Sequence, residues 1–151
     1  TAEDFLVLTS ASFIGSTVGG NPSLINGLTV PLADNWVLTP EEQNNIQIAT
    51  DAYNATITNI GTANGLAVVD LDGLLSEAAT SGTQFDDFIM TTNLVFGGMV
   101  SLDGIHLTTR GYALMAKKIL EGIDTTYGSN FSASGNMPKA NNYPTNYPPG
   151  I

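Results

Sequence analysis

The sequence contains a single histidine, His106, and an aspartate three residues before it, Asp103. In a loop just ahead of a helix, this spacing allows the carboxylate to fold back onto the imidazole. The carboxylate then accepts a hydrogen bond from one ring nitrogen and leaves the other nitrogen free to act as a general base. Such a pair is the base and orienting group of a nucleophilic triad. A surface histidine with an aspartate nearby is the alternative, and the spacing alone favours that alternative.

The residues around this pair, 103–116 (DGIHLTTRGYALMA), resemble the last sequence block of the SGNH, or GDSL-type, esterase and lipase family. Residues 6–20, 31–42 and 49–56 resemble one bacterial branch of the same family, so the resemblance covers nearly the whole chain. It implies a serine ester hydrolase with a three-layer α/β/α, flavodoxin-like fold and a parallel sheet. It also implies that His106 is the base and Asp103 the orienting residue, with an ester as substrate and no cofactor.

The nucleophile of that family is missing from the sequence. The family places its catalytic serine in a Gly-Asp-Ser block and takes oxyanion donors from a Gly-x-Asn-Asp block, and neither block is present. The resemblance therefore implies the C-terminal half of an enzyme, with the N-terminal half as its partner. Ser10 and Ser12 follow the first predicted strand, where open α/β sheets bind ligands. Because no strained turn motif presents either serine, we expect a lining role for them.

Several residues in similar loops are candidates for the wall of a substrate site. Their side chains are apolar or small, as an acyl or alkyl group requires. For the apolar members, ordinary core packing is an equally good interpretation. The substrate-binding candidates are Ser12, Phe13, Ile14, Phe96 and Met99.

Composition excludes several functions. Fourteen acidic residues against four basic ones give a net charge of −10, which would repel nucleic acid. The chain has no cysteine, and its carboxylates and lone histidine match no metal-binding spacing, so we expect no metal site. No apolar stretch approaches the roughly 18 residues of a membrane span. The charged fraction is only 12%, which, with the resemblance, favours a secreted, periplasmic or outer-surface bacterial protein.

The patterning predicts alternating strands and helices. Residues 4–9 and 66–70 are short apolar runs without alternation, typical of strands buried on both faces. Thr39, Pro40 and Glu42 form a capping box before one helix, a short helix is expected at residues 72–79, and Thr108 should cap the last helix. This order favours a parallel sheet covered by helices. Two strands cannot complete such a sheet, so its other strands are expected before Thr1.

The predicted organisation is a domain over residues 1–128 and an Asn-, Tyr- and Pro-rich surface tail over residues 129–151. The rival function is a non-catalytic binding or surface module that uses the loop at residues 10–38 and the tail. A third possibility is a fragment that is inert without its N-terminal half. The interpretations differ over His106, because only an enzyme needs it accessible and hydrogen-bonded to Asp103.

Overall fold

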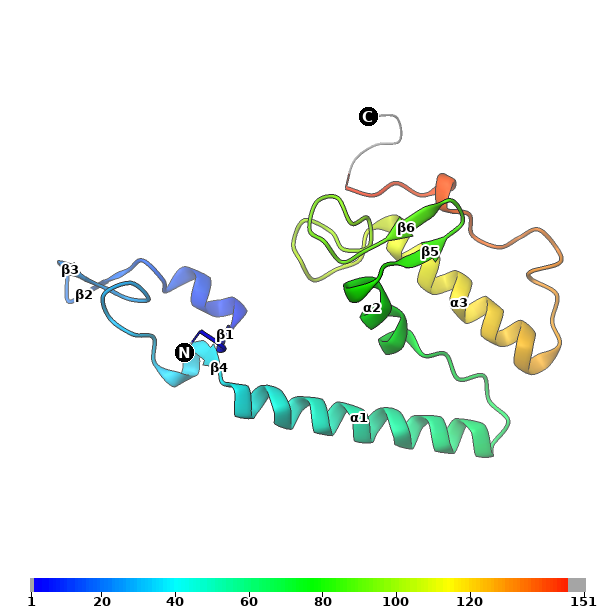
Figure 1. Cartoon of the computed structure of the whole chain (residues 1–151), viewed down its shortest axis with the longest axis horizontal. Coiled ribbons are helices and arrows are strands. Elements are labelled where there is room, and N and C mark those ends of the chain that lie inside the picture. The colour runs from blue at the N-terminus through cyan, green and yellow to red at the C-terminus, as the bar shows by residue number, and fades with distance from the viewer. Residues whose placement is uncertain (1, 147–151) are drawn as a thin grey trace. The chain divides into compact units, whose positions relative to one another are not determined.

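The computed structural model describes residues 2–146, and these divide into two compact units after Thr56 (Figure 1). We refer to residues before this boundary as the N-terminal unit and to those after it as the C-terminal unit. Helix α1 (Pro40–Ala63) crosses the boundary. The candidate base lies in the C-terminal unit, and each unit is described separately below.

Short antiparallel pairs and turns build the N-terminal unit. Strand β1 (Phe5–Leu6) pairs antiparallel with β4 (Val37–Leu38), and β2 (Thr17–Val18) pairs antiparallel with β3 (Asn21–Ile25). The 3₁₀ helices η1 (Leu8–Ser12) and η2 (Asp34–Trp36) connect them. Phe13 stacks on Trp36 with ring centroids 4.5 Å apart. This stacked pair joins the end of η1 to the end of η2.

The capping box predicted for α1 is confirmed. The backbone N–H of Thr39 donates to Glu42 Oε2 at 2.9 Å, and the Glu42 N–H donates to Thr39 Oγ1 at 3.4 Å. These bonds satisfy two backbone donors at the helix start. The apolar stripe of the helix is nevertheless uncovered, since Ile46 and Tyr53 are more than half exposed and Gly61 is its one buried residue among those described.

The C-terminal unit contains helix α2 (Leu71–Thr80), a hairpin of β5 (Thr83–Phe85) and β6 (Phe88–Met90), and helix α3 (Thr109–Tyr127) (Figure 1). Asp70 caps α2 by accepting from the Gly73 N–H at 2.7 Å, so the helix predicted at residues 72–79 begins one residue earlier, at Leu71. Thr108 caps α3 as predicted, accepting from the Gly111 N–H at 3.0 Å.

A small core joins these elements. Its buried apolar members come from α2, the hairpin, the following loop, α3 and the tail: Leu74, Ala78, Phe85, Met90, Met99, Ala113, Leu114 and Ala140. The face of α3 that packs here carries Ala113 and Leu114, whereas Tyr112 and Ile119 are exposed. Met115 of the same helix is partly buried and packs against this core.

The segment after α3 is fastened to the core. Ala140, in the 3₁₀ helix η3 (Ala140–Asn142), is fully buried, and its N–H donates to Asp86 Oδ2 at 2.7 Å. Asp86 also pairs with Lys117 of α3 at 3.1 Å. The guanidinium of Arg110 donates to the carbonyls of Ala140 and Tyr143. One carboxylate and one guanidinium thus tie the tail to the hairpin and to α3.

The predicted three-layer α/β/α fold with a parallel sheet is wrong for the part of the chain that the structure describes. Residues 2–146 form three separate two-stranded antiparallel sheets. Residues 66–70, expected as a central strand, form no strand. The reason is the lack of a partner: apolar character predicts burial of this run, but a strand also needs a neighbouring backbone, and none of the described residues provides one.

Candidate functional site

A tight turn between two backbone anchors carries the candidate base. At its outer end the Thr108 N–H donates to the Met99 carbonyl at 2.9 Å, and closer in the Ser101 N–H donates to the His106 carbonyl at 2.8 Å. Val100 and Leu107 form an antiparallel bridge between them. The tip turns at Gly104, whose φ of +74° is the left-handed conformation that glycine adopts without steric cost. The turn is therefore held in place by backbone groups of its own two arms.

Asp103 holds the turn together from inside. Its Oδ1 atom accepts three hydrogen bonds, from Ser101 Oγ at 2.7 Å, from the Ile105 N–H at 2.9 Å and from the His106 N–H at 2.9 Å. These donors stabilise the ionised form, so the pKa of Asp103 lies well below its usual range, the Ser101 hydroxyl being the largest cause. The carboxylate is charged throughout the neutral range.

The second oxygen of Asp103, Oδ2, lies 2.7 Å from His106 Nδ1. Because a charged carboxylate only accepts, Nδ1 carries the proton of the neutral ring and Nε2 keeps its lone pair. The His106 side chain is 70% exposed, and among residues 2–146 no hydrogen bond engages Nε2. The predicted fold-back of the aspartate onto the imidazole is thus present, and the geometry is that of a general base with an oriented ring.

The structure provides no nucleophile for this base in the described part of the C-terminal unit, where no serine hydroxyl bonds to His106. The Ser101 hydroxyl donates to Asp103 instead. In the N-terminal unit Ser10 is buried, and the Ser12 hydroxyl donates to the Thr9 carbonyl at 3.1 Å. Neither of these two serines is engaged by a base in the structure.

The predicted wall residues fall into different settings. Phe13 stacks on Trp36, and Ile14 lies against Gly27 and is 38% exposed. Phe96 is 87% exposed, in the loop before the core residue Met99, which is fully buried. For Met99 the structure therefore favours core packing, which was the alternative interpretation. Phe96 and Met99 belong to the C-terminal unit, as His106 does.

A groove that sequence reasoning missed adjoins the turn that carries His106. It has a volume of about 590 Å³, and α2, the loop after β6 and the turn itself line it. Ile105 and Leu107, on either side of His106, are part of its wall. The sequence indicates one wall of the groove, because Leu75 and Ala79 are four residues apart and share a face of α2. The opposite wall depends on tertiary packing, which the sequence does not show.

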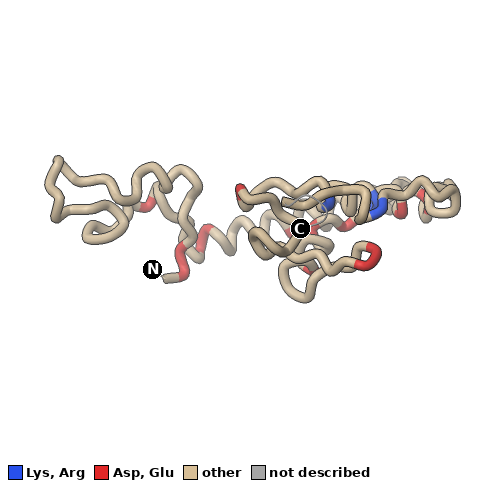
Figure 2. Tube along the Cα trace, turned by 90° about the horizontal axis from the view of Figure 1, so that it is seen from above, with Lys and Arg blue, Asp and Glu red and all other residues tan. Residues whose placement is uncertain are grey.

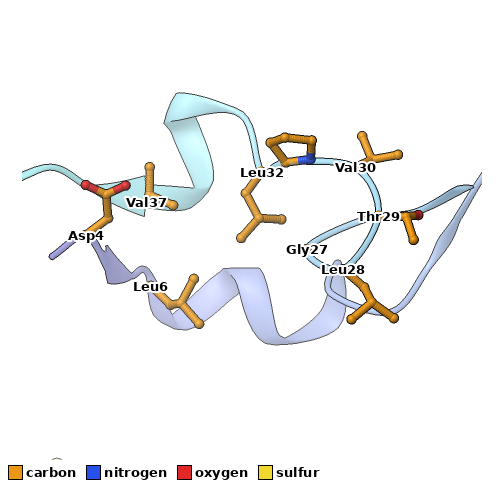
Figure 3. A pocket seen from close by; sticks show the side chains of 9 residues that line it. Asp4, Leu6, Gly27, Leu28, Thr29, Val30, Leu32 and Val37 are labelled. Atoms are coloured by element: carbon orange, nitrogen blue, oxygen red, sulfur yellow. The ribbon is translucent and has the colours of Figure 1, made fainter. Parts of the chain in front are cut away.

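A second hollow, of about 360 Å³, lies within the N-terminal unit (Figure 3). Leu32 points into the space that Leu6 and Leu28 border, and Asp4 lies at one end beside Val37. Leu6 and Leu28 are 58% and 77% exposed. The residues that line this hollow include neither a histidine nor a serine.

The distribution of charged and metal-ligating side chains bears on which ligands the chain could bind. All four basic residues fall between positions 110 and 139, and six acidic residues with no basic one lie in the N-terminal unit (Figure 2). In the part of the chain that the structure describes, no cluster of three or more His, Asp or Glu side chains could hold a metal ion. No helix among these residues is both long enough and apolar enough to cross a membrane.

No family model, curated protein or solved structure matches the chain. The resemblance to the SGNH family therefore rests on the sequence blocks quoted above.

Proposed function

We propose that this chain supplies the general base and its orienting carboxylate to a serine ester hydrolase. The observation that carries the proposal is the 2.7 Å hydrogen bond between Asp103 Oδ2 and His106 Nδ1, on a ring whose side chain is 70% exposed. A surface histidine that merely has an aspartate nearby, the alternative interpretation, does not have its tautomer fixed by a direct hydrogen bond to the ring. A fixed tautomer together with an accessible Nε2 is what proton transfer from an attacking hydroxyl requires.

The proposed reaction is acyl transfer to water. A serine hydroxyl attacks the ester carbonyl while His106 Nε2 takes its proton, and Asp103 stabilises the imidazolium that forms. The imidazolium then gives this proton to the leaving alcohol. In the second half of the cycle His106 takes a proton from water, which attacks the acyl-serine; the serine–acyl bond breaks, the imidazolium returns the proton to the serine oxygen, and the carboxylic acid is released. The chain needs no metal or organic cofactor for these steps.

The nucleophilic serine is proposed to come from a second polypeptide segment that carries the Gly-Asp-Ser and Gly-x-Asn-Asp blocks of the family. This part of the proposal follows from the absence of both blocks in the sequence and from the hydrogen bond that already occupies the Ser101 hydroxyl. The acidic surface disfavours nucleic acid as a partner. A secreted, periplasmic or outer-surface location in a bacterium is part of the same proposal.

The test is hydrolysis of p-nitrophenyl acetate and butyrate by the chain alone and by the chain mixed with a polypeptide bearing the two missing blocks. Wild type is compared with His106→Ala. The matched control is Asp124→Asn, because Asp124 also accepts hydrogen bonds from a serine hydroxyl and two backbone N–H groups but contacts no histidine. We expect saturable turnover that is lost in His106→Ala and kept in Asp124→Asn.

Equal turnover in wild type and His106→Ala would overturn the proposal. Absence of turnover both by the chain alone and by the chain mixed with the second polypeptide would overturn it as well. If the chain alone shows turnover that requires His106, the assignment of the base stands and the nucleophile belongs to this chain. Loss of turnover in Ser10→Ala or Ser12→Ala would then identify it. A binding module, the rival function, uses surfaces such as the hollow of the N-terminal unit. It predicts that ligand binding survives His106→Ala unchanged.

A further inference from the structure

The groove beside the turn that carries Asp103 and His106 has two walls, which come from segments distant in sequence. Helix α2 provides one wall with Leu75, Ser76 and Ala79, and the opposite wall contains Leu94, Ile105 and Leu107. Leu94 and Ile105 are 53% and 59% exposed, although both are large apolar side chains. The groove therefore presents apolar surface to solvent, which burial under an apolar ligand would stabilise.

The lining of the groove selects the chemistry of an occupant. No charged side chain lines it, and the hydroxyl groups of Ser76 and Thr92 are the polar side-chain groups in its wall. A sugar needs many hydrogen-bond partners and a charged ligand needs a counter-charge, and this wall offers neither. An unbranched alkyl chain needs only apolar contact.

The position of the groove connects that occupant to the base. Gly104, Ile105 and Leu107 in its wall belong to the same turn as Asp103 and His106. An alkyl chain that lies along this part of the wall contacts Ile105 and Leu107, the two residues that flank His106. The backbone anchors of the turn fix this relationship, because they hold Leu107 to Val100 and the His106 carbonyl to the Ser101 N–H.

We propose that this groove binds the alkyl chain of the ester substrate, so that the substrate class is aliphatic esters of medium or long chain and not acetylated sugars. The inference rests on the proposed function, because the bound ester is a substrate only if the chain takes part in ester hydrolysis. Binding of an unbranched alkyl ester along Leu75, Ala79 and Ile105 can be measured without any hydrolysis.

The experiment is an NMR titration of the full isotope-labelled chain with methyl octanoate and with methyl butanoate. We expect both esters to shift signals of Leu75, Ala79, Leu94 and Ile105, with methyl octanoate binding more tightly. Each fully buried methylene is worth about fourfold in affinity. Four additional methylenes in an open groove should therefore give a preference of at least about tenfold.

Ala79→Phe fills the groove from α2, and it should weaken methyl octanoate binding at least about tenfold. Ala79 is exposed, so the substitution leaves the core intact. Ala133→Phe makes the same change at another exposed alanine, outside the groove, and should bind as wild type does. Leu94→Ser, which removes apolar wall on the opposite side, is the second variant and should also weaken binding.

Equal affinity of Ala79→Phe and Ala133→Phe, or shifts confined to other surfaces, would overturn the inference. Equal affinity of the groove for both esters would also overturn the inference, because the affinity of a groove that binds alkyl chains must rise with the number of methylenes. The two proposals fail separately. His106-dependent hydrolysis without chain-length preference or groove binding removes only the groove, whereas groove binding without His106-dependent hydrolysis removes only the proposed function.

Discussion

Asp103 contacts His106 twice, once through each carboxylate oxygen. Oδ2 lies 2.7 Å from the ring Nδ1, and Oδ1 accepts the backbone N–H of the same histidine at 2.9 Å. The first contact fixes the tautomer of the ring, and the second fixes the backbone from which the ring projects. One carboxylate thus sets both the chemistry and the position of the base.

The first prediction concerns the tautomer. In Asp103→Asn the amide can donate to Nδ1, so the neutral ring should shift toward the form protonated at Nε2. Long-range ¹H–¹⁵N NMR of the histidine ring should report Nδ1–H in wild type and a change in the variant. Loss of an orienting carboxylate costs on the order of 10⁴-fold in kcat in a serine triad, so turnover should fall steeply. Unchanged ring signals in Asp103→Asn, or an equal change in Asp124→Asn, would contradict this assignment.

The second prediction is the pH dependence of Asp103. Its folded pKa lies below its unfolded value of about 3.9. The stabilisation from this carboxylate is therefore fully present above that value and is lost as the pH falls through the folded pKa. Ser101→Ala removes the largest cause of the lowered pKa, so the titration should move up toward the ordinary range.

Carboxyl ¹³C shifts measured against pH check this prediction. Ser129→Ala is the matched control, because the Ser129 hydroxyl is the largest cause of the lowered pKa of Asp124. It should move the titration of Asp124 and leave that of Asp103 unchanged. A titration of Asp103 that is the same in Ser101→Ala and wild type would show that the backbone donors and the His106 ring hold the carboxylate without the serine hydroxyl.

The third prediction concerns the support behind the turn. The buried Thr108 hydroxyl donates to the Gly98 carbonyl at 2.6 Å and accepts from the Gly111 N–H at 3.0 Å. Thr108→Val keeps the shape but removes the cap and leaves buried backbone groups without partners. We expect a loss of about 2 kcal/mol in the free energy of unfolding.

Urea denaturation of Thr108→Val and Thr125→Val makes the comparison. Thr125 lies in the same helix and its exposed side chain donates only to the Glu121 carbonyl, so its substitution should cost less than about 0.5 kcal/mol. Equal losses in the two variants would mean that the hydroxyl of Thr108 acts only through helix propensity.

The fourth prediction concerns the apolar run at residues 66–70. Within the described part of the chain the N–H groups of Val68, Val69 and Asp70 form no backbone hydrogen bonds, and Leu66 is 54% exposed. Such an edge favours pairing with another strand. The purified chain should self-associate with increasing concentration, and Leu66→Lys should reduce this association in sedimentation velocity.

Leu28→Lys makes the same change at a side chain that is 77% exposed but lies in a turn of the N-terminal unit. It should leave more of the association intact than Leu66→Lys does. A chain that stays monomeric at high concentration, with a sharp thermal transition, would rule out the edge as an association site.

Local sequence determined the features that depend on neighbours along the chain. The capping box of Thr39 and Glu42, the cap at Thr108 and the fold-back of Asp103 onto His106 each span three residues. Their geometry follows from side-chain length and backbone turn, and the structure contains all of them. The role of His106 as a base remains a prediction.

Tertiary structure alone decided what those elements pack against. Apolar residues at 66–70 and along α1 and α3 predicted burial, but apolar character does not specify a partner. A strand needs a second backbone at hydrogen-bond distance, and residues 2–146 give the run at 66–70 none, so the parallel sheet is absent. The same limit hid the groove, because Leu75 and Ile105 are thirty residues apart and only the packing of α2 near the turn that carries His106 brings them into one groove.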